Sequence, residues 1–302
     1  MANIQTARPT LALNPSPFLS QENTMLVRIA VHMDSDLRCA SRLEIAAQLA
    51  AQHKAELVGV YVRYLPFRFY KQTGQSDEIY SPIRTKLSQE EEKARTLFEE
   101  AAAANGVLAR WKSPQGELGP ALALQARYCD LIVMSQFNPN ETSAPQYANL
   151  AEEVIMGAGR PVLVLPYAGK IATPIGHSVL FCWDLGREAA RAFADARPIL
   201  HEAAELIVLT VDEEAERMRP NDLDPQDISI YSKLRKYPEP RIVSRPSRDI
   251  GVGCTILNAA TDYGSDLIVM GAYGHSRLRE WVLGGASRTL IQTMTVPVLF
   301  SH

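Results

Sequence analysis

The sequence lacks the features that mark membrane, disulfide-rich and nucleic-acid-binding proteins. Its 302 residues contain four cysteines and no CxxC pair, which argues against a disulfide framework or a zinc site and predicts buried free thiols in a reducing compartment. No apolar run approaches the roughly 18 residues that predict a membrane-spanning helix. The net charge of −3 at pH 7 leaves no basic excess for nucleic acid. We therefore expect a cytoplasmic protein that binds neither membranes nor nucleic acid.

Catalytic motifs are also missing. The chain has no Walker lysine motif, no HIGH or KMSKS pair and no SGGxD loop, and GVGCTI at Gly251 lacks the third glycine of a dinucleotide fingerprint. No histidine stands at metal-ligand spacing. His275 and Glu280 are the candidates for a catalytic base, and neither has a recognisable nucleophile beside it. We expect no catalytic residues and no metal site.

What the sequence does contain is an internal duplication. DLIVM occurs at 130–134 and again at 266–270, and Pro-Val-Leu follows each copy at the same distance. Upstream of each copy a short apolar run ends in an aspartate, Asp34 in RIAVHMD and Asp184 in SVLFCWD. Such a repeat predicts two domains of one architecture.

Each half alternates short β-branched runs with helical stretches, which predicts an α/β fold with a parallel sheet and helices on both faces. Runs such as LIVM and VLVL are apolar throughout, as in strands covered on both sides. In the second half we expect strands at 177–183, 205–211, 240–245, 266–270 and 296–301. We divide the chain into a disordered extension at 1–24, a first domain at 25–168, a linker at 169–176 and a second domain at 177–302.

Three further predictions concern the polar segments. The capping box that starts at Ser88 predicts a helix start, and Asn105-Gly106 predicts the end of that helix. The charge runs Glu90–Glu92 and Asp212–Glu214 are expected on solvated helix faces or in loops. Segment 63–87, rich in aromatic and basic residues, is expected to be a surface loop that either packs on its own domain or binds a partner or ligand.

The segment GAYGHSRLREWVLGGASRTL carries the clearest ligand-binding signal. Gly271 and Gly274 follow a predicted strand, and Gly284 and Gly285 precede a predicted helix. Ligands of open parallel sheets bind beyond the carboxyl ends of the strands, and a helix start with free N–H groups favours an anion. Glycine lets phosphate oxygens approach where a Cβ would collide. The segment therefore predicts a phosphate-binding loop, and the alternative is that the glycines only shape a tight strand–loop–helix connection.

The duplication and the glycine spacing together resemble a tandem universal stress protein over about residues 25–302. The G-x2-G-x9-G-[S/T] pattern of nucleotide-binding members is matched by Gly271, Gly274 and Gly284, but Gly285 stands where the pattern has Ser or Thr. Ser287 supplies the second hydroxyl of that family. The resemblance implies two doubly wound domains, each with a five-stranded parallel sheet in the order 3-2-1-4-5. It also implies ATP, with or without Mg²⁺, over strands 1 and 4.

The same resemblance implies a set of site residues. Asp184 would hold the nucleoside, Val211 would lie beside adenine, and the backbone near Gly284–Ala286 with the Ser287 hydroxyl would hold the phosphates. The alternatives are an N-cap role for Asp184, a core role for Val211, and packing for Trp183 in place of base stacking. The candidate cofactor-binding residues are Trp183, Asp184, Val211, Met270, Gly271, Gly274, Gly284, Gly285, Ala286 and Ser287.

The first half departs from this pattern at every glycine. Its residues opposite the five phosphate-loop positions are Ser135, Asn138, Ala148, Asn149 and Ala151. Asp34 is kept, and we expect it to serve a turn. The first half is therefore expected to bind no nucleotide and to act as a partner for the second.

These observations predict a stress-response sensor or regulator that binds ATP in its C-terminal domain. A scaffold that works only through protein contacts and a slow ATPase are the alternatives. In relatives, two domains often pair through their last strands, so RPVLVLP and VPVLFSH are expected to make an intramolecular pseudo-dimer. A further homodimer and a protein partner of unknown identity are also expected.

Overall fold

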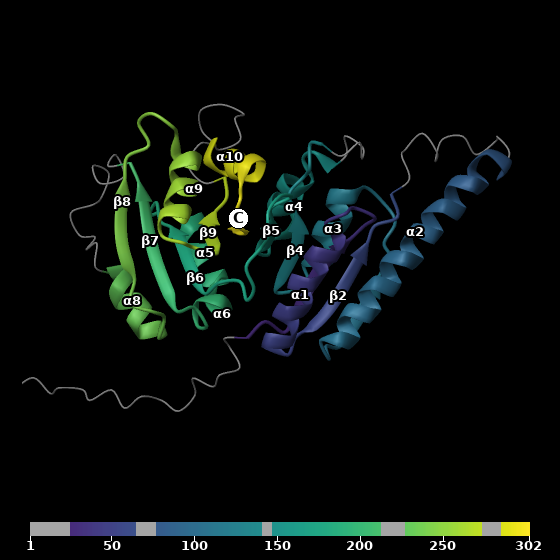
Figure 1. Cartoon of the computed structure of the whole chain (residues 1–302), viewed down its shortest axis with the longest axis horizontal. Helices are drawn as coiled ribbons and strands as arrows, with labels where there is room; N and C mark the ends of the chain where they lie inside the picture. Colours follow the sequence, from purple (N-terminus) through teal and green to yellow (C-terminus); the bar gives the residue numbers. More distant parts are fainter. Residues whose placement is uncertain (1–24, 65–76, 141–146, 213–226, 274–284) are drawn as a thin grey trace, which may run out of the picture.

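The computed structural model describes residues 25–64, 77–140, 147–212, 227–273 and 285–302. They form one ten-stranded sheet in the order β3-β2-β1-β4-β5-β10-β9-β6-β7-β8 (Figure 1). The strands of the first half are β1 (Arg28–Met33), β2 (Glu56–Tyr61), β3 (Ala109–Lys112), β4 (Leu131–Ser135) and β5 (Val162–Leu165). Those of the second half are β6 (Ser178–Cys182), β7 (Glu205–Val211), β8 (Arg241–Arg245), β9 (Leu267–Gly271) and β10 (Val298–Ser301).

Within each half the strands are parallel and follow the predicted order 3-2-1-4-5. The central strands are buried almost from end to end because helices cover both faces of the sheet. The outermost strands β3 and β8 are largely exposed and carry basic side chains, a composition that suits a sheet edge. The α/β fold predicted from the alternation of strands and helices is confirmed, and so are the doubly wound sheets that the family resemblance implied.

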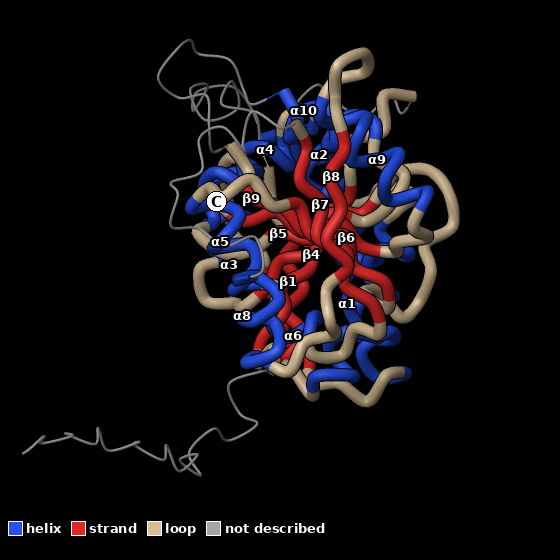
Figure 2. The backbone as a smooth tube through the Cα atoms, turned by 90° about the vertical axis from the view of Figure 1, so that its left-hand side faces the viewer, coloured by secondary structure: helices blue, strands red, loops and turns tan. Residues whose placement is uncertain are grey.

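Two layers of helices enclose the sheet, as Figure 2 shows around the fan of strands. One face carries α1 (Cys39–His53), α2 (Asp77–Ala104), α5 (Arg187–Asp195), α6 (Arg197–Leu200) and α8 (Asp227–Arg235). The other face carries α3 (Leu118–Ala126), α4 (Leu150–Ala158), α9 (Val252–Asp262) and α10 (Gly285–Thr293). Each of the two buried apolar clusters contains residues from both halves of the chain. The hydrophobic core is therefore continuous across the molecule.

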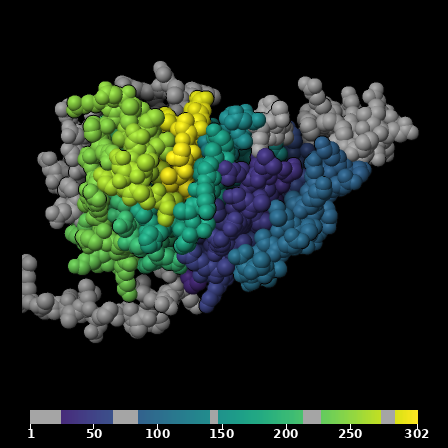
Figure 3. Space-filling model, in the orientation of Figure 1, coloured from purple at the N-terminus to yellow at the C-terminus, as the bar shows by residue number. Residues whose placement is uncertain are grey.

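The halves meet where β5 and β10 pair in the antiparallel direction. Leu163 lies opposite Leu299 and Val162 opposite Phe300, and all four side chains are buried. Arg191 of α5 reaches across the junction and donates from Nη2 to the carbonyl oxygen of Gly159 at 2.9 Å. Figure 3 shows the teal residues that include α4 and β5 in contact with the yellow C-terminal residues. The strand pairing thus leaves neither β5 nor β10 as an open sheet edge.

Three of the local predictions are wrong. The surface loop expected at 63–87 is helical from Asp77 onward, and residues 65–76 lie outside the described part of the chain. Helix α2 begins at Asp77, so Ser88 lies inside the helix, because the residues just before the capping box continue the helix. Glu91 is buried within the predicted solvated run and accepts hydrogen bonds from Arg63 at 2.7 Å and Ser113 at 2.6 Å. These contacts tie α2 to the edge of the sheet.

The four cysteines are free, but they are not all buried. Cys39 and Cys129 are buried, Cys182 is half-buried and Cys254 is exposed on α9. No helix in the part of the chain that the structure describes has the length and apolar character needed to cross a membrane.

We predict that the two halves unfold in a single cooperative transition, because both apolar clusters and the sheet run through the junction. A Phe300→Ala substitution should lower the stability of the whole molecule by about 3–5 kcal/mol, the usual loss for a buried phenylalanine. Scanning calorimetry would measure both effects. The exposed Leu234 of α8 provides the control, since Leu234→Ala should change stability by less than about 0.5 kcal/mol. Two separate transitions, with only one lowered by Phe300→Ala, would contradict the prediction.

Candidate functional site

The candidate site lies at the carboxyl ends of β6, β7 and β9. The chain runs from β6 to β7 on one side and returns to β9 on the other side of β6. This reversal of strand order opens a crevice, which is where open parallel sheets bind ligands. A cavity of about 310 Å³ occupies it.

Every predicted site residue that the structure describes lines this one cavity. They are Trp183, Asp184, Val211, Met270, Gly271, Gly285, Ala286 and Ser287. Gly274 and Gly284 lie outside the described residues, as do His275 and Glu280. The lining residues that sequence reasoning missed are Cys182, Ala189, Leu209, Val252, Ile256 and Tyr273. Most of these are apolar residues at strand ends or on helix faces, where the sequence gives no sign that separates a cavity wall from the core.

Asp184 is exposed at the mouth of the cavity and is oriented by its own loop. Its Oδ1 accepts a hydrogen bond from the backbone N–H of Gly186 at 2.7 Å. Leu185 between them has a φ of 63°, an uncommon conformation for a residue with a branched side chain. The N-cap of α5 is Gly186, without a side-chain hydrogen bond, so the N-cap role considered for Asp184 is wrong. The loop therefore fixes the Asp184 carboxylate at the edge of the cavity.

Gly271 ends β9 where α5 passes directly over the sheet. A Cβ on this glycine would stand 2.5 Å from the backbone nitrogen of Ala189 and 2.5 Å from the carbonyl carbon of Glu188. Such contacts are far inside van der Waals distance. The group that comes close to Gly271 is therefore the first turn of α5, and the glycine is needed for the packing of helix on strand.

Gly285 and Ser287 stand in opposite environments in the first turn of α10. Gly285 is exposed, and a Cβ added there would meet no atom of the described residues within 4 Å. Ser287 is buried, and its Oγ accepts a hydrogen bond from the backbone N–H of Tyr273 at 3.4 Å. Tyr273 has a φ of 62°, so the serine hydroxyl supports a strained position just after β9.

Trp183 and Val211 both pack on the core and line the cavity. The indole of Trp183 lies 5.7 Å from the ring of Phe181, and its backbone N–H donates to the Leu209 carbonyl oxygen at 2.8 Å. Val211 is half-buried at the end of β7. The next residue, Asp212, accepts a hydrogen bond from the backbone N–H of Ser247 at 2.7 Å and so links this strand end to the loop after β8.

Few ionisable side chains stand among the described residues that line the cavity. Asp184 is the one carboxylate among the described lining residues. Burial raises the pKa of the Cys182 thiol and of the Tyr273 phenol, so neither is an anionic nucleophile near neutral pH. The described residues also contain no group of three or more His, Cys, Asp or Glu side chains that could hold a metal ion.

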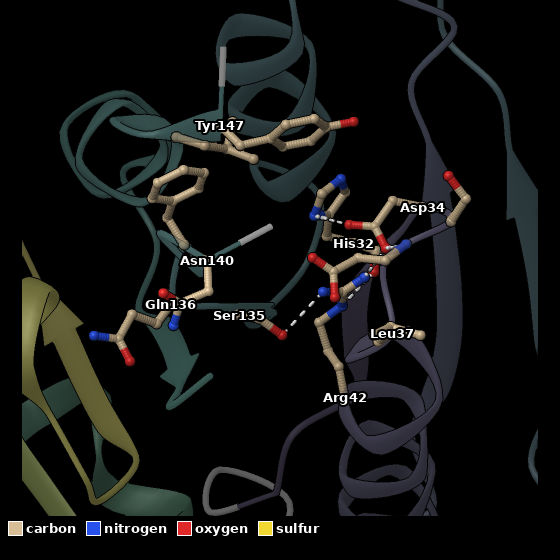
Figure 4. Close-up of a pocket in the computed structure, with 12 residues that line it drawn as sticks. His32, Asp34, Leu37, Arg42, Ser135, Gln136, Asn140 and Tyr147 are labelled. Carbon is tan, nitrogen blue, oxygen red and sulfur yellow. Dashed lines mark hydrogen bonds and ion pairs between the residues drawn. The ribbon is translucent and has the colours of Figure 1, made fainter. Parts of the chain in front are cut away.

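The first half has a cavity of its own at the matching strand ends, those of β1 and β4, with a volume of about 370 Å³. Figure 4 shows that its labelled residues include a cluster of polar side chains. Arg42 of α1 is fully buried and donates to the His32 carbonyl oxygen at 2.6 Å, to Ser135 Oγ at 2.9 Å and to Asp34 Oδ1 at 2.7 Å. Asp34 Oδ1 also accepts from the Asp36 N–H at 3.1 Å, which is the turn role expected for Asp34.

The ion pair with Arg42 was not predicted. The signal for it was present, because Arg42 shares a helix face with the apolar Ile45, Ala46 and Leu49. Its partner Ser135 stands at the position that Gly271 holds in the second half.

Burial determines how this cluster titrates. Burial would raise the pKa of Asp34, but the charges of Arg42 and His32 and the hydrogen bonds to the carboxylate outweigh it and hold that pKa below its usual value. Burial lowers the pKa of His32 to about 4, and the nearby Asp34 carboxylate offsets only part of this effect. At neutral pH the cluster therefore holds a neutral imidazole beside an intact ion pair.

Lowering the pH from 7 to 5 is expected to destabilise the protein through His32. The unfolded chain binds a proton at the ordinary pKa of 6.5, whereas folded His32 stays neutral until its pKa of about 4. Acid therefore favours unfolding in this window, by about 2 kcal/mol from this residue. Urea denaturation at both pH values measures the loss. Burial also lowers the pKa of His53, which contributes to the pH dependence of stability in the wild type and in the His32→Gln variant alike. His32→Gln should therefore reduce this pH dependence without removing it. An equal loss in both would contradict the assignment.

Comparisons with known proteins agree with this fold. Residues 177–302 match the sequence model of the Universal stress protein family. A search of curated protein sequences found no match. Among solved structures, a universal stress protein from Archaeoglobus fulgidus DSM 4304 is 18% identical with a TM-score of 0.69, and the match covers 93% of this chain and 99% of that one. A putative universal stress protein from Pseudomonas aeruginosa UCBPP-PA14 is 17% identical with a TM-score of 0.57, covering 93% and 94%.

Both structural matches extend over the two halves of the chain, whereas the sequence match is limited to the second half. The second half contains the glycines of the phosphate-loop pattern, and the first half has other residues at those positions. The second half therefore belongs to the universal stress protein family, the first half repeats its fold, and the chain carries two domains of this type in tandem.

Proposed function

We propose that the second domain binds ATP and that the protein acts as a nucleotide-responsive stress regulator, not as a turnover enzyme. The observation that carries this proposal is the convergence of residues from three strand ends and the start of α10 on one cavity. Their sequence positions follow the pattern of nucleotide-binding relatives. The limited set of ionisable groups in the described part of the lining supports binding over catalysis.

The chemistry of the lining suits the parts of the nucleotide. Leu209, Val211 and Ile256 give an apolar wall for the adenine ring, and Asp184 at the mouth can accept hydrogen bonds from the nucleoside. The start of α10, where Gly285 is exposed, offers backbone N–H groups and the positive end of the helix dipole to phosphates. Since Asp184 is the one carboxylate in the described lining, any Mg²⁺ would be held mainly by the phosphates themselves.

We further propose that the first domain serves as the partner of the second, joined through β5 and β10 as an intramolecular pseudo-dimer. A homodimer of whole chains and an unidentified protein partner would build on this unit. Both outer edges, β3 and β8, are available within the described chain for such contacts.

The competing function is a scaffold that holds no nucleotide. Two observations favour it: Gly285 lacks the hydroxyl of the family pattern, and the side chain of Ser287 is buried. Calorimetric titration of the emptied full-length protein with ATP decides between them. One ATP per chain supports the proposal, and no binding supports the scaffold.

Substitutions in the cavity should change ATP affinity in opposite directions. Asp184→Asn removes a charged acceptor and should weaken binding about tenfold or more, the usual value of a hydrogen bond to a charged group. Gly285→Ser restores a hydroxyl in open space and should strengthen binding several-fold. Calorimetry of both variants beside the wild type measures the shifts. Unchanged affinity in both would show that ATP binds elsewhere.

Gly271→Ala should act on the fold before it acts on the ligand. The new methyl group would collide with the backbone of α5, so we expect a loss of about 1–3 kcal/mol in the free energy of unfolding. Gly285→Ala is the matched control, because its Cβ has open space among the described residues. Denaturant titration measures both. If Gly271→Ala kept full stability and lost only ATP, the glycine would serve the ligand alone.

A further inference from the structure

The cavity of the first domain lies at a ligand-binding position of the fold, even though the phosphate-loop glycines are gone. Asp34 follows β1, and Ser135 and Gln136 mark the end of β4, the two strands between which strand order reverses in this half. Crevices at such reversals bind ligands in open parallel sheets. At about 370 Å³ the cavity is large enough for a small molecule.

One side of this cavity is a fixed polar surface. Arg42 is held by three hydrogen bonds and in turn holds the Asp34 carboxylate and the Ser135 hydroxyl in place. Asp34 Oδ2 lies 3.5 Å from His32 Nδ1, and no hydrogen bond from a described residue reaches it. A ligand with hydroxyl groups would therefore find an ionised acceptor that is already oriented.

An aromatic side chain lies across the cavity from this polar surface. Figure 4 shows Tyr147 on the side away from Arg42 and Ser135. The apolar Phe137 and Leu150 and the polar Gln136 and Asn140 are also among the lining residues. An aromatic side chain in this position suits the flat face of a ring. The ligand that fits both sides has a ring at one end and hydroxyl groups at the other.

The charges around the cavity disfavour phosphate. The positive charge of Arg42 is neutralised by Asp34, and Asp36 adds a further negative charge to the lining. The first turn of α4 carries Glu152 and Glu153, whereas the first turn of α10 carries no acidic residue. Carboxylates at a helix start oppose the anion binding that the helix dipole would otherwise favour.

We propose that the first domain has its own binding site, in this cavity, for an uncharged ring-bearing molecule with hydroxyl groups, of the nucleoside class and without phosphates. The site is distinct from the proposed ATP site in both position and charge preference. The protein would then hold two different ligands in two copies of one fold.

The test is a calorimetric titration of the full-length protein with adenosine, first alone and then in saturating ATP. We expect one adenosine per chain in saturating ATP, because ATP fills the second cavity and should not enter the first. Without ATP a second adenosine can also bind in the second cavity, where Asp184 and the apolar wall are proposed to hold a nucleoside. Asp34→Asn should weaken the binding in saturating ATP about tenfold or more through loss of the charged acceptor. Asp184→Asn, the same change in the other cavity, should leave one adenosine site in place.

Asp34→Asn leaves Arg42 buried without the carboxylate that pairs with it, so the thermal unfolding of this variant must be measured. Tyr147→Leu provides an independent variant on the opposite side of the cavity. Tyr147→Leu should also weaken adenosine binding. No adenosine binding, complete loss of adenosine binding in saturating ATP, or full affinity in both Tyr147→Leu and a folded Asp34→Asn would each overturn the proposal. Failure of ATP to bind would overturn the ATP site alone, since the first titration does not use ATP.

Discussion

The antiparallel pairing of β5 with β10 is the constraint on which the rest of the molecule depends. Each domain winds outward from this junction, so the last strand of each copy becomes a central strand of a ten-stranded sheet. Residues such as Leu163 and Leu299 are consequently buried on both faces, and the apolar clusters on either side of the sheet run through both domains. An isolated domain would expose this edge to water and to other strands. The duplication thus provides each copy with the partner that its own last strand requires.

Once the strands are fixed, the same reversal of strand order creates a crevice in each copy, and the side chains that reach it decide its chemistry. In the second domain the small Ala189 lines the crevice, and Gly271 allows α5 to lie against β9. In the first domain Arg42 of α1 extends into the crevice, and the Ser135 hydroxyl accepts a hydrogen bond from it. Arg42 on the helix and Ser135 at the strand end depend on each other. A buried guanidinium requires hydrogen-bond acceptors, and those acceptors require the guanidinium.

Sequence patterns predicted the strand positions well because these follow from continuous apolar runs, whereas strand order came from the family resemblance. The resemblance also supplied Asp184, Val211 and Ser287 as site residues, and the structure brings all three to one cavity because they lie at or just after strand ends or in the first turn of a helix. What could not be predicted depends on partners distant in sequence. Arg42 donates a hydrogen bond to Ser135, 93 residues later, and Glu91 accepts hydrogen bonds from Arg63 and Ser113, which follow β2 and β3. Ser88 shows the opposite limit, because a capping box marks a helix start only where the preceding residues interrupt the helix.

Gly271 and Gly285 show that a residue can match a phosphate-loop motif without being required by a ligand. Gly271 fits a phosphate-loop pattern, yet its missing side chain is explained by the backbone of α5, which passes within 2.5 Å of the position of a Cβ. Gly285 has open space instead, and a side chain there would meet no described atom. The first glycine is therefore a requirement of packing, and it stays necessary whether or not a ligand binds. The second carries no such requirement among the described residues, so a side chain can be introduced there without disturbing the packing. The proposed ATP site is therefore best probed at Gly285 and Asp184, whereas Arg42 of the first domain is buried, makes three hydrogen bonds and is itself part of the packing.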